Sequence, residues 1–241
     1  MNGTSHRGFS RPAIFIKAFR YSIPVLLGYV TIGIAFGLLL SDAGYPWWLA
    51  PLMSLWMFAG AAQFIALGFF AAGTSVWEAC LIQLVVNARH IAYGLSMLTQ
   101  YRDTGPFKPY LVFSLTDETF ALLSSKPEMP ERERPLFMFC VSILDQSYWV
   151  IGTSVGALAG SLIPFDMTGV GFALTALFVV LMIEQFIKSR QGAGIGYGVF
   201  ILSAAAAIAG VFLIPGSISL LAALAFALLL SPLLEKKGKE A

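Results

Sequence analysis

Long apolar runs separated by short polar connections make up most of the chain. Hydropathy predicts about eight membrane spans of roughly 18–25 residues each. They cover residues 21–41, 48–71, 75–99, 108–124, 135–162, 168–187, 196–214 and 216–234. The fourth is the weakest, because it contains Asp117 and Glu118, and it is either a short span or a re-entrant segment shielded by its neighbours. The pattern therefore predicts an all-α, polytopic transmembrane helix bundle of about seven or eight spans, with broken or re-entrant segments.

Composition supports the membrane prediction and excludes several other classes. The chain is 58% hydrophobic and only 12% charged, whereas a soluble domain carries about 25% charged residues. A net charge of +2 gives no reason to expect a nucleic-acid partner. The two cysteines, Cys80 and Cys140, are isolated in apolar runs, so that we expect neither a metal site nor a cofactor.

Lysine and arginine gather in the leader, two connections and the tail. These four segments are 1–20, 125–134, 188–195 and 235–241. Because cytoplasmic loops carry an excess of Lys and Arg, we expect all four on the cytoplasmic side, where an eight-span chain places them. The connection 101–109 is the exception and would be external. The prediction is a basic cytoplasmic leader, a single transmembrane domain over 21–234 and a basic cytoplasmic tail.

A weak internal two-fold repeat relates the two parts of that domain, about 21–125 and 135–234. Tyr29, Gly33 and Gly37 recur as Tyr148, Gly152 and Gly156, at an offset of 119 residues. Repeats of this kind are typical of secondary transporters, with the substrate site between the halves. Eight spans make the halves parallel, whereas a segment 108–124 that does not cross would invert them.

Glycines at a spacing of four residues accompany the repeat. Gly33 and Gly37 form one such pair, and Gly152, Gly156 and Gly160 form a double one. We expect these glycines to allow close helix packing. Residues 152–156 also match G-x-S-x-G, but no strand precedes them, so that a hydrolase is not expected.

A polar stripe interrupts the third apolar run. Gln83, Asn87 and His90 share one helical face, and Arg89 lies beside it. An arginine in the middle of a bilayer costs about 2.5–3.5 kcal/mol on insertion scales, so that it needs a partner. The candidates are Asp117, Glu118 and Asp145. Such a pair either holds helices together or belongs to a substrate or proton site.

Four stretches carry a family resemblance. NARHIAYG (87–94), SLTDETFAL (114–122), GYVTIGIAFG (28–37) and FAGAAQF (58–64) resemble the AzlC family of branched-chain amino acid permeases, over about residues 15–235. The resemblance implies secondary export of branched-chain amino acids such as valine, coupled to the proton gradient, in a bacterial inner membrane. It also implies a partner, a small three-span membrane protein of the AzlD type.

A branched-chain amino acid is a zwitterion with an apolar tail, which determines the site that we expect. Asp117 or Asp145 would meet its ammonium group, and Arg89 with Asn87 its carboxylate. Phe58, Phe64, Phe113 and Trp149 would line the tail pocket. The expected substrate-binding residues are Phe58, Gln63, Asn87, Arg89, Asp117, Asp145 and Trp149. An unperturbed histidine titrates near neutral pH, so that His90 could exchange protons, as could Glu118 if burial raises its pKa.

Three other functions stay open at this point. The chain could transport another small solute, form a channel, or act as a scaffold subunit without transport of its own. An enzyme is not expected, since no nucleophile and base can be paired by sequence. Transport direction, coupling ion and oligomeric state, including a homo-oligomer, are not determined by the sequence.

Overall fold

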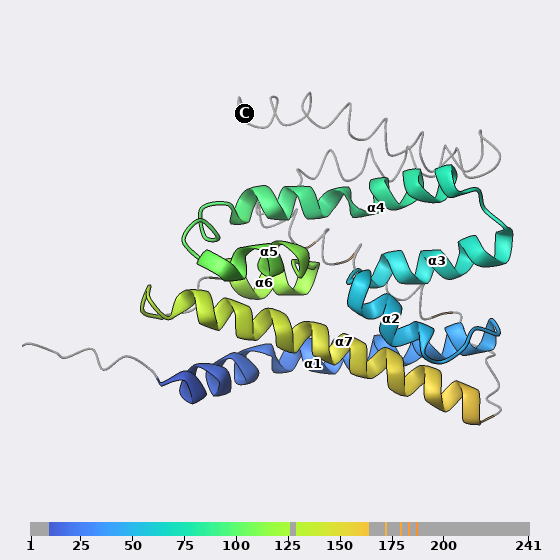
Figure 1. Ribbon diagram of the computed structural model, residues 1–241, viewed down its shortest axis with the longest axis horizontal. Helices are drawn as coiled ribbons and strands as arrows, with labels where there is room; N and C mark the ends of the chain where they lie inside the picture. Colours follow the sequence, from blue (N-terminus) through green and yellow to red (C-terminus); the bar gives the residue numbers. More distant parts are fainter. Residues whose placement is uncertain are drawn as a thin grey trace, which may run out of the picture. The chain divides into compact units, whose positions relative to one another are not determined.

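The computed structural model describes residues 10–125 and 129–163, together with the single positions 172, 179, 183 and 187. Helices make up these ranges, and no strand occurs within them, as the sequence predicted (Figure 1). They are α1 (Arg11–Asp42), α2 (Leu49–Trp56), α3 (Gly60–Ala72), α4 (Val76–Met97), the 3₁₀ helix η1 (Gly105–Phe107), α5 (Lys108–Phe113), α6 (Asp117–Ser124) and α7 (Arg134–Leu162). Apart from Cys80–Val85, the two ranges belong to one compact unit.

Several predictions lie outside the described residues. These are the spans 168–187, 196–214 and 216–234, the basic connection 188–195 and the tail 235–241. The second half of the repeat, about 135–234, is described only as far as residue 163, apart from the four single positions.

Helix α1 is longer than the span predicted over 21–41. It begins at Arg11, with Pro12 in its first turn, where the missing N–H of proline costs nothing. The described part of the basic leader is thus largely helical, and Pro24 lies in the helix interior. At 32 residues α1 is about 48 Å long, which exceeds the hydrocarbon thickness of a bilayer.

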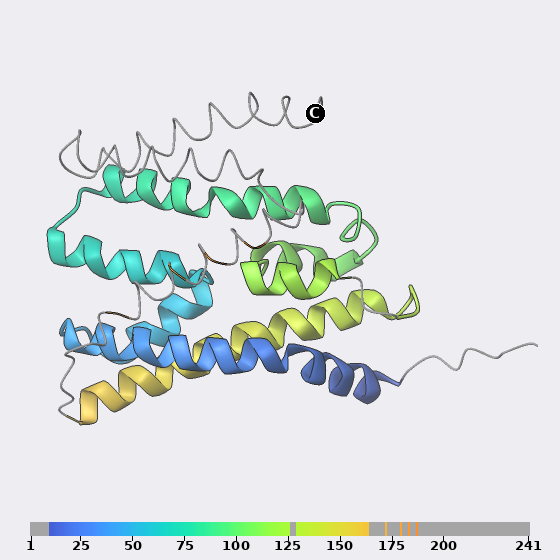
Figure 2. The ribbon, with the colours of Figure 1, turned by 180° about the vertical axis from the view of Figure 1, so that it is seen from behind.

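Helices α1 and α7 pack against each other and run in the same direction (Figures 1 and 2). Glycines line their contact. A Cβ atom added at Gly33 would lie 3.0 Å from the Thr153 backbone nitrogen, and one added at Gly152 would lie 2.9 Å from the Val30 carbonyl oxygen. The missing side chains therefore let the two backbones approach closely.

The same contact continues one and two turns further along both helices. A Cβ atom at Gly37 would overlap the Thr153 carbonyl oxygen, and one at Gly156 would overlap the Ile34 carbonyl oxygen. At Gly160 it would lie 2.8 Å from the Ser41 side chain. Helices α1 and α7 are also the two described helices that are long and apolar enough to cross a membrane.

The segment predicted as the span 48–71 is not one continuous helix. It is divided into α2, of 8 residues, and α3, of 13 residues, and the chain turns back between them (Figures 1 and 2). Neither helix is long enough to cross a bilayer alone. The break falls at Met57 and Ala59, whose backbones leave the helical region. We call this pair the first hairpin.

The segment predicted as the span 108–124 is divided in the same way. Helices α5 and α6 have 6 and 8 residues, and the chain again turns back between them (Figures 1 and 2). This second hairpin therefore corresponds to the re-entrant alternative in the sequence analysis. Gln146 of α7 joins both hairpins, since it accepts a hydrogen bond from Tyr110 of α5 at 2.7 Å and donates one to the Leu55 carbonyl oxygen of α2 at 3.2 Å.

The third predicted span, 75–99, is the continuous helix α4. Ser75 caps its N-terminus by accepting a hydrogen bond from the Glu78 N–H at 3.3 Å. Its 22 residues extend over about 33 Å, enough to cross a bilayer by length.

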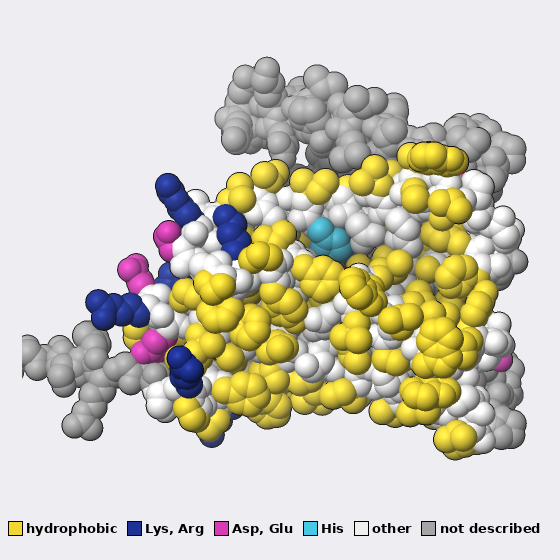
Figure 3. Space-filling view, viewed as in Figure 1, with side chains coloured by type: hydrophobic (Ala, Val, Ile, Leu, Met, Phe, Trp, Pro, Cys, Tyr) yellow, Lys and Arg dark blue, Asp and Glu magenta, His cyan; other side chains and the backbone are white. Residues whose placement is uncertain are grey.

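The two hairpins change which connections share an end of the molecule. The connection between α4 and α5 lies at the end where α1 and α7 begin (Figure 1). On the face shown in Figure 3, charged side chains gather at that end and hydrophobic ones cover most of the remainder. Arg102, Lys108 and Arg132 are exposed there. The eight-span prediction put 101–109 opposite 125–134. The structure differs, because the second hairpin, which lies between these two connections, returns to the end from which it started.

Candidate functional site

The N-terminus of α6 supplies two acidic residues at the tip of the second hairpin. Thr116 caps this helix by accepting a hydrogen bond from the Thr119 N–H at 3.3 Å, and Asp117 and Glu118 form its first turn. Acidic side chains are favourable at this position because the helix dipole is positive there. The sequence "TDET" thus starts a helix in the middle of a predicted span.

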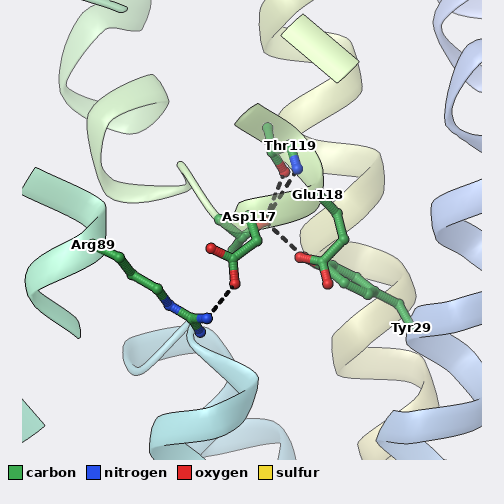
Figure 4. A network of polar contacts seen from close by, with 6 residues as sticks. Tyr29, Arg89, Asp117, Glu118 and Thr119 are labelled. Carbon is green, nitrogen blue, oxygen red and sulfur yellow. Dashed lines mark hydrogen bonds and ion pairs between the residues drawn. The ribbon is translucent and has the colours of Figure 1, made fainter. Parts of the chain in front are cut away.

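Asp117 pairs with Arg89. One guanidinium nitrogen of Arg89, on α4, lies 2.9 Å from Asp117 Oδ2 (Figure 4). The two side chains are 30% and 15% exposed, so that the ion pair is largely shielded from solvent. Asp117 was the first of three candidate partners in the sequence analysis, and this contact is present. Beside it, the ring of Tyr93 stacks on Phe120 with centroids 4.6 Å apart.

Glu118 and Asp145 were also candidate partners of Arg89, but they face other groups. The hydroxyl group of Tyr29, on α1, donates a hydrogen bond to Glu118 Oε2 at 2.7 Å (Figure 4). Asp145, on α7, is fully buried and accepts a hydrogen bond from the Thr119 hydroxyl at 2.8 Å. The helix geometry of α6 separates Glu118 from Asp117, because consecutive residues of a helix point about 100° apart.

A second polar cluster lies beside the break in the first hairpin. The Trp149 indole N–H donates to Gln63 Oε1 at 2.7 Å, and the Gln63 amide group donates to Ser54 Oγ at 3.3 Å. Ser54 in turn hydrogen-bonds Thr153 at 2.8 Å. A Cβ atom at Gly60 would lie 3.0 Å from the Trp149 ring. Gly60 therefore makes room for this tryptophan at the start of α3.

Tyr29 lies between the two clusters. Its ring is 5.5 Å from that of Trp149 and 6.1 Å from that of Phe58, both in edge-on orientation. Its hydroxyl group reaches Thr116 as well as Glu118. Residues from α1, α6 and α7 and from the break before α3 thus meet around one buried tyrosine.

The other residues predicted for the site differ in their burial and in their contacts. Asn87 is half-buried on α4, two residues before Arg89, and His90 lies within electrostatic reach of Asp117 and Arg89. Phe64 is buried against Phe36, with ring centroids 5.4 Å apart. Phe113 is 46% exposed, so that it does not line a buried tail pocket in this conformation.

Sequence reasoning missed the hydroxyl groups of the site. Tyr29 was recognised only as a repeat position, and Thr116 and Thr119 were not singled out. The "TDET" pattern carried a signal for Thr116, because a threonine followed by acidic residues is typical of a helix N-terminus. Tyr29 had no such signal, since its contacts join residues 87 and 89 positions apart.

Comparison with known proteins identifies the family. The model of the AzlC protein family matches residues 24–163, which include every residue of the two clusters. The chain belongs to the AzlC family. Similar proteins include the branched-chain amino acid transport protein AzlC of Bacillus subtilis, 36% identical over 214 residues, which cover 88% of this chain and 84% of that protein.

Other AzlC relatives are named as membrane proteins. An uncharacterized membrane protein of Helicobacter pylori is 40% identical over 200 residues, covering 81% of this chain and 88% of its own length. The inner membrane protein YgaZ of Escherichia coli is 30% identical over 190 residues, covering 74% and 76%. No solved structure matches this AzlC chain. The names of the relatives, together with α1 and α7, agree with a helical membrane protein of a transport family.

Proposed function

We propose that this protein is a secondary transporter that exports branched-chain amino acids such as valine from a bacterial cell, driven by the proton gradient. The Arg89–Asp117 ion pair, at the tip of a broken helix, is the observation that carries the proposal. Similarity to a branched-chain amino acid transport protein supports the substrate class. Broken helices beside buried charges are typical of substrate sites in secondary transporters.

The zwitterionic substrate suits this ion pair chemically. When the pair opens, Arg89 can bind the substrate carboxylate with two hydrogen bonds and Asp117 can bind its ammonium group. One ion pair is then exchanged for two, which offsets the loss of the original contact. Asn87, on the same helix α4, is proposed as a further donor to the carboxylate.

The aromatic side chains around Tyr29 supply the apolar surface for the substrate tail. Phe58 and Trp149 are 6% and 3% exposed in this conformation, so that the site as described is closed. Gln63, held by Trp149, fixes the start of α3 beside them. Asp145 is fully buried and held by Thr119, and for this reason we assign the substrate ammonium group to Asp117. His90 and Glu118 remain the proposed proton-coupling residues.

The proposed assembly includes a small three-span subunit of the AzlD type. The proposed location is the inner membrane, with the N-terminus and the charged end on the cytoplasmic side. The excess of exposed Lys and Arg at that end supports this orientation. Co-expression with and without the small subunit, followed by purification through a tag on either chain, tests the partnership.

Export of valine from loaded cells tests the substrate site. Arg89→Ala and Asp117→Asn should each lower export about tenfold or more, because hydrogen bonds to charged groups contribute about 1.5–3 kcal/mol each. His90→Ala should remove the dependence of export on the proton gradient. Arg102→Ala and Asp103→Asn are matched controls, since both residues are exposed at the charged end. Near-normal export by all three site variants, at equal abundance in the membrane, would refute the proposed site. Export of chemically diverse solutes at similar rates would instead indicate a different substrate class.

A further inference from the structure

Four hydrogen bonds in series join two carboxyl groups from different helices. The Tyr29 hydroxyl group is 2.7 Å from Glu118 Oε2 and 2.7 Å from Thr116 Oγ1. The Thr116 and Thr119 hydroxyl oxygens are 3.0 Å apart, and the Thr119 hydroxyl group is 2.8 Å from Asp145 Oδ2. Figure 4 shows the part of this path around Glu118. We call the hydroxyl groups of Tyr29, Thr116 and Thr119 the hydroxyl chain.

The hydroxyl chain contains too few hydrogens for these four contacts. Each contact needs one hydrogen between its two oxygen atoms, and the three hydroxyl groups supply one each. If both carboxyl groups were ionised, one pair of oxygens would face each other without a hydrogen. The Thr119 N–H, which donates to Thr116 Oγ1 at 3.3 Å, lies outside the series and does not fill the gap. One protonated carboxyl group supplies the missing hydrogen.

Either end of the series can hold that hydrogen. We propose that Glu118 and Asp145 share one proton, which moves between them along the hydroxyl chain. When the proton leaves Glu118, its O–H bond breaks, and each hydroxyl oxygen accepts a hydrogen from one side and passes its own to the other. Asp145 Oδ2 gains the last one, so that Glu118 becomes ionised and Asp145 neutral. The reverse shift restores the first state, and no other reactant takes part.

The surroundings of the two carboxyl groups differ, and this difference determines which of the two groups holds the shared proton. Asp145 is fully buried, and its Oδ1 makes no hydrogen bond to any described residue. A buried, ionised oxygen without a donor is costly in free energy. Protonation of Asp145 removes this cost in the conformation described. Glu118 is next in sequence to Asp117, whose pairing with Arg89 determines the charge beside it.

Titratable and charged groups face both ends of the series. Around Glu118 these are Tyr29 of α1, Arg89 and Tyr93 of α4, and Asp117 of α6. Around Asp145 they are Tyr29 of α1, Tyr110 of α5, Glu118 of α6 and Tyr148 of α7. Arg89 is the cation in this set, and it belongs to the proposed substrate site. Opening of its ion pair with Asp117 would change the field at Glu118 and thereby move the shared proton.

The shared proton and its coupling to export rest on different observations. The shared proton rests on the contacts alone. Its coupling to export rests on the proposed function, since substrate binding is what would open the ion pair. The test is therefore made on the purified full chain without substrate, and a failure of valine transport leaves its result unaffected.

Infrared spectroscopy of the purified protein detects the shared proton through the carbonyl stretch of a protonated carboxyl group, which shifts in D₂O. At neutral pH the wild-type protein should show this band. Glu118→Gln and Asp145→Asn should each abolish it, because the new amide group donates the fourth hydrogen and the remaining carboxyl group ionises. Absence of the band from the wild type, or its survival in either variant, would overturn the proposal. Unchanged thermal unfolding confirms that each isosteric variant is folded.

Tyr29→Phe tests the path between the two groups. It removes the middle of the hydroxyl chain, so that the carboxyl groups should titrate independently and the band should respond to only one of the two carboxyl substitutions. Tyr148→Phe is the matched control, because its hydroxyl group bonds Ser22 at 2.9 Å and lies outside the hydroxyl chain. In that background the band should still respond to both substitutions. A response to both in the Tyr29→Phe background would show that the proton does not use this path.

Discussion

Asp117 and Glu118 are adjacent in the sequence, yet the fold gives them different partners. Asp117 contacts α4 through Arg89, and Glu118 contacts α1 through Tyr29. Both residues lie in the first turn of α6, where consecutive side chains point in different directions around the helix axis. At the residue scale, one dipeptide thus serves the proposed substrate site and the proposed proton path.

Gln63 offers a test of the second polar cluster at this scale. Gln63→Met has a similar volume but removes the acceptor for the Trp149 N–H and the donor to Ser54. Because buried polar groups left unpaired cost about 1–3 kcal/mol each, we expect a clear fall in the midpoint of thermal unfolding. Tryptophan fluorescence measures this midpoint. Gln100→Met, in the turn after α4, is the control and should leave the midpoint nearly unchanged. Equal midpoints for the two variants would mean that the cluster does not stabilise the fold.

At the element scale, the contact of α1 with α7 and the two hairpins decide the architecture. The glycines predicted to pack helices lie where the two backbones meet. Hydropathy predicted one continuous span in place of the first hairpin and left the second as either a short span or a re-entrant segment. It measures composition and contains no information on where a helix breaks. For the second hairpin the "TDET" pattern did mark a helix start. For the first hairpin the break lies beside Trp149, a residue of another helix.

Gly37→Ala tests the helix contact. The added methyl group would overlap the Thr153 carbonyl oxygen, and since backbone atoms cannot turn aside, the helices must separate. Overpacking of this kind costs about 1–3 kcal/mol, which should appear as reduced resistance to denaturant in detergent. Gly28→Ala, on the same helix, is the matched control, because an added Cβ there meets no heavy atom within 4 Å. Its stability should be equal or slightly higher, as alanine favours a helix more than glycine does.

At the scale of the whole molecule, the hairpins predict which connections lie on the same side of the membrane. Asp103, between α4 and α5, and Glu131, before α7, lie at the charged end, whereas Asp42, at the end of α1, lies at the opposite end (Figure 1). The parallel direction of α1 and α7 requires an odd number of crossings between them. A single crossing by α4, with both hairpins returning to their own side, meets this condition, and three continuous spans would meet it as well.

Cysteine labelling tests this topology in intact cells. In a background without Cys80 and Cys140, Asp103→Cys and Glu131→Cys should react alike with a membrane-impermeant reagent. Asp42→Cys should differ from both: it should be labelled if they are protected, and protected if they are labelled. Labelling of positions 103 and 131 from opposite sides would contradict the second hairpin, and labelling of positions 42 and 103 from the same side would contradict the first. Both results together would support eight continuous crossings.

The sequence by itself determined the helical class, the membrane setting and the family, because each depends on composition or on short motifs. It also identified Arg89 as needing an acidic partner and the glycines as packing residues. The tertiary structure decided which acid pairs with Arg89, where two predicted spans break, and that Tyr29 joins Glu118 to the threonines. The physical reason is the distance along the chain. A hydrogen bond between residues 29 and 118 leaves no periodic trace in the sequence, since only the fold brings them together.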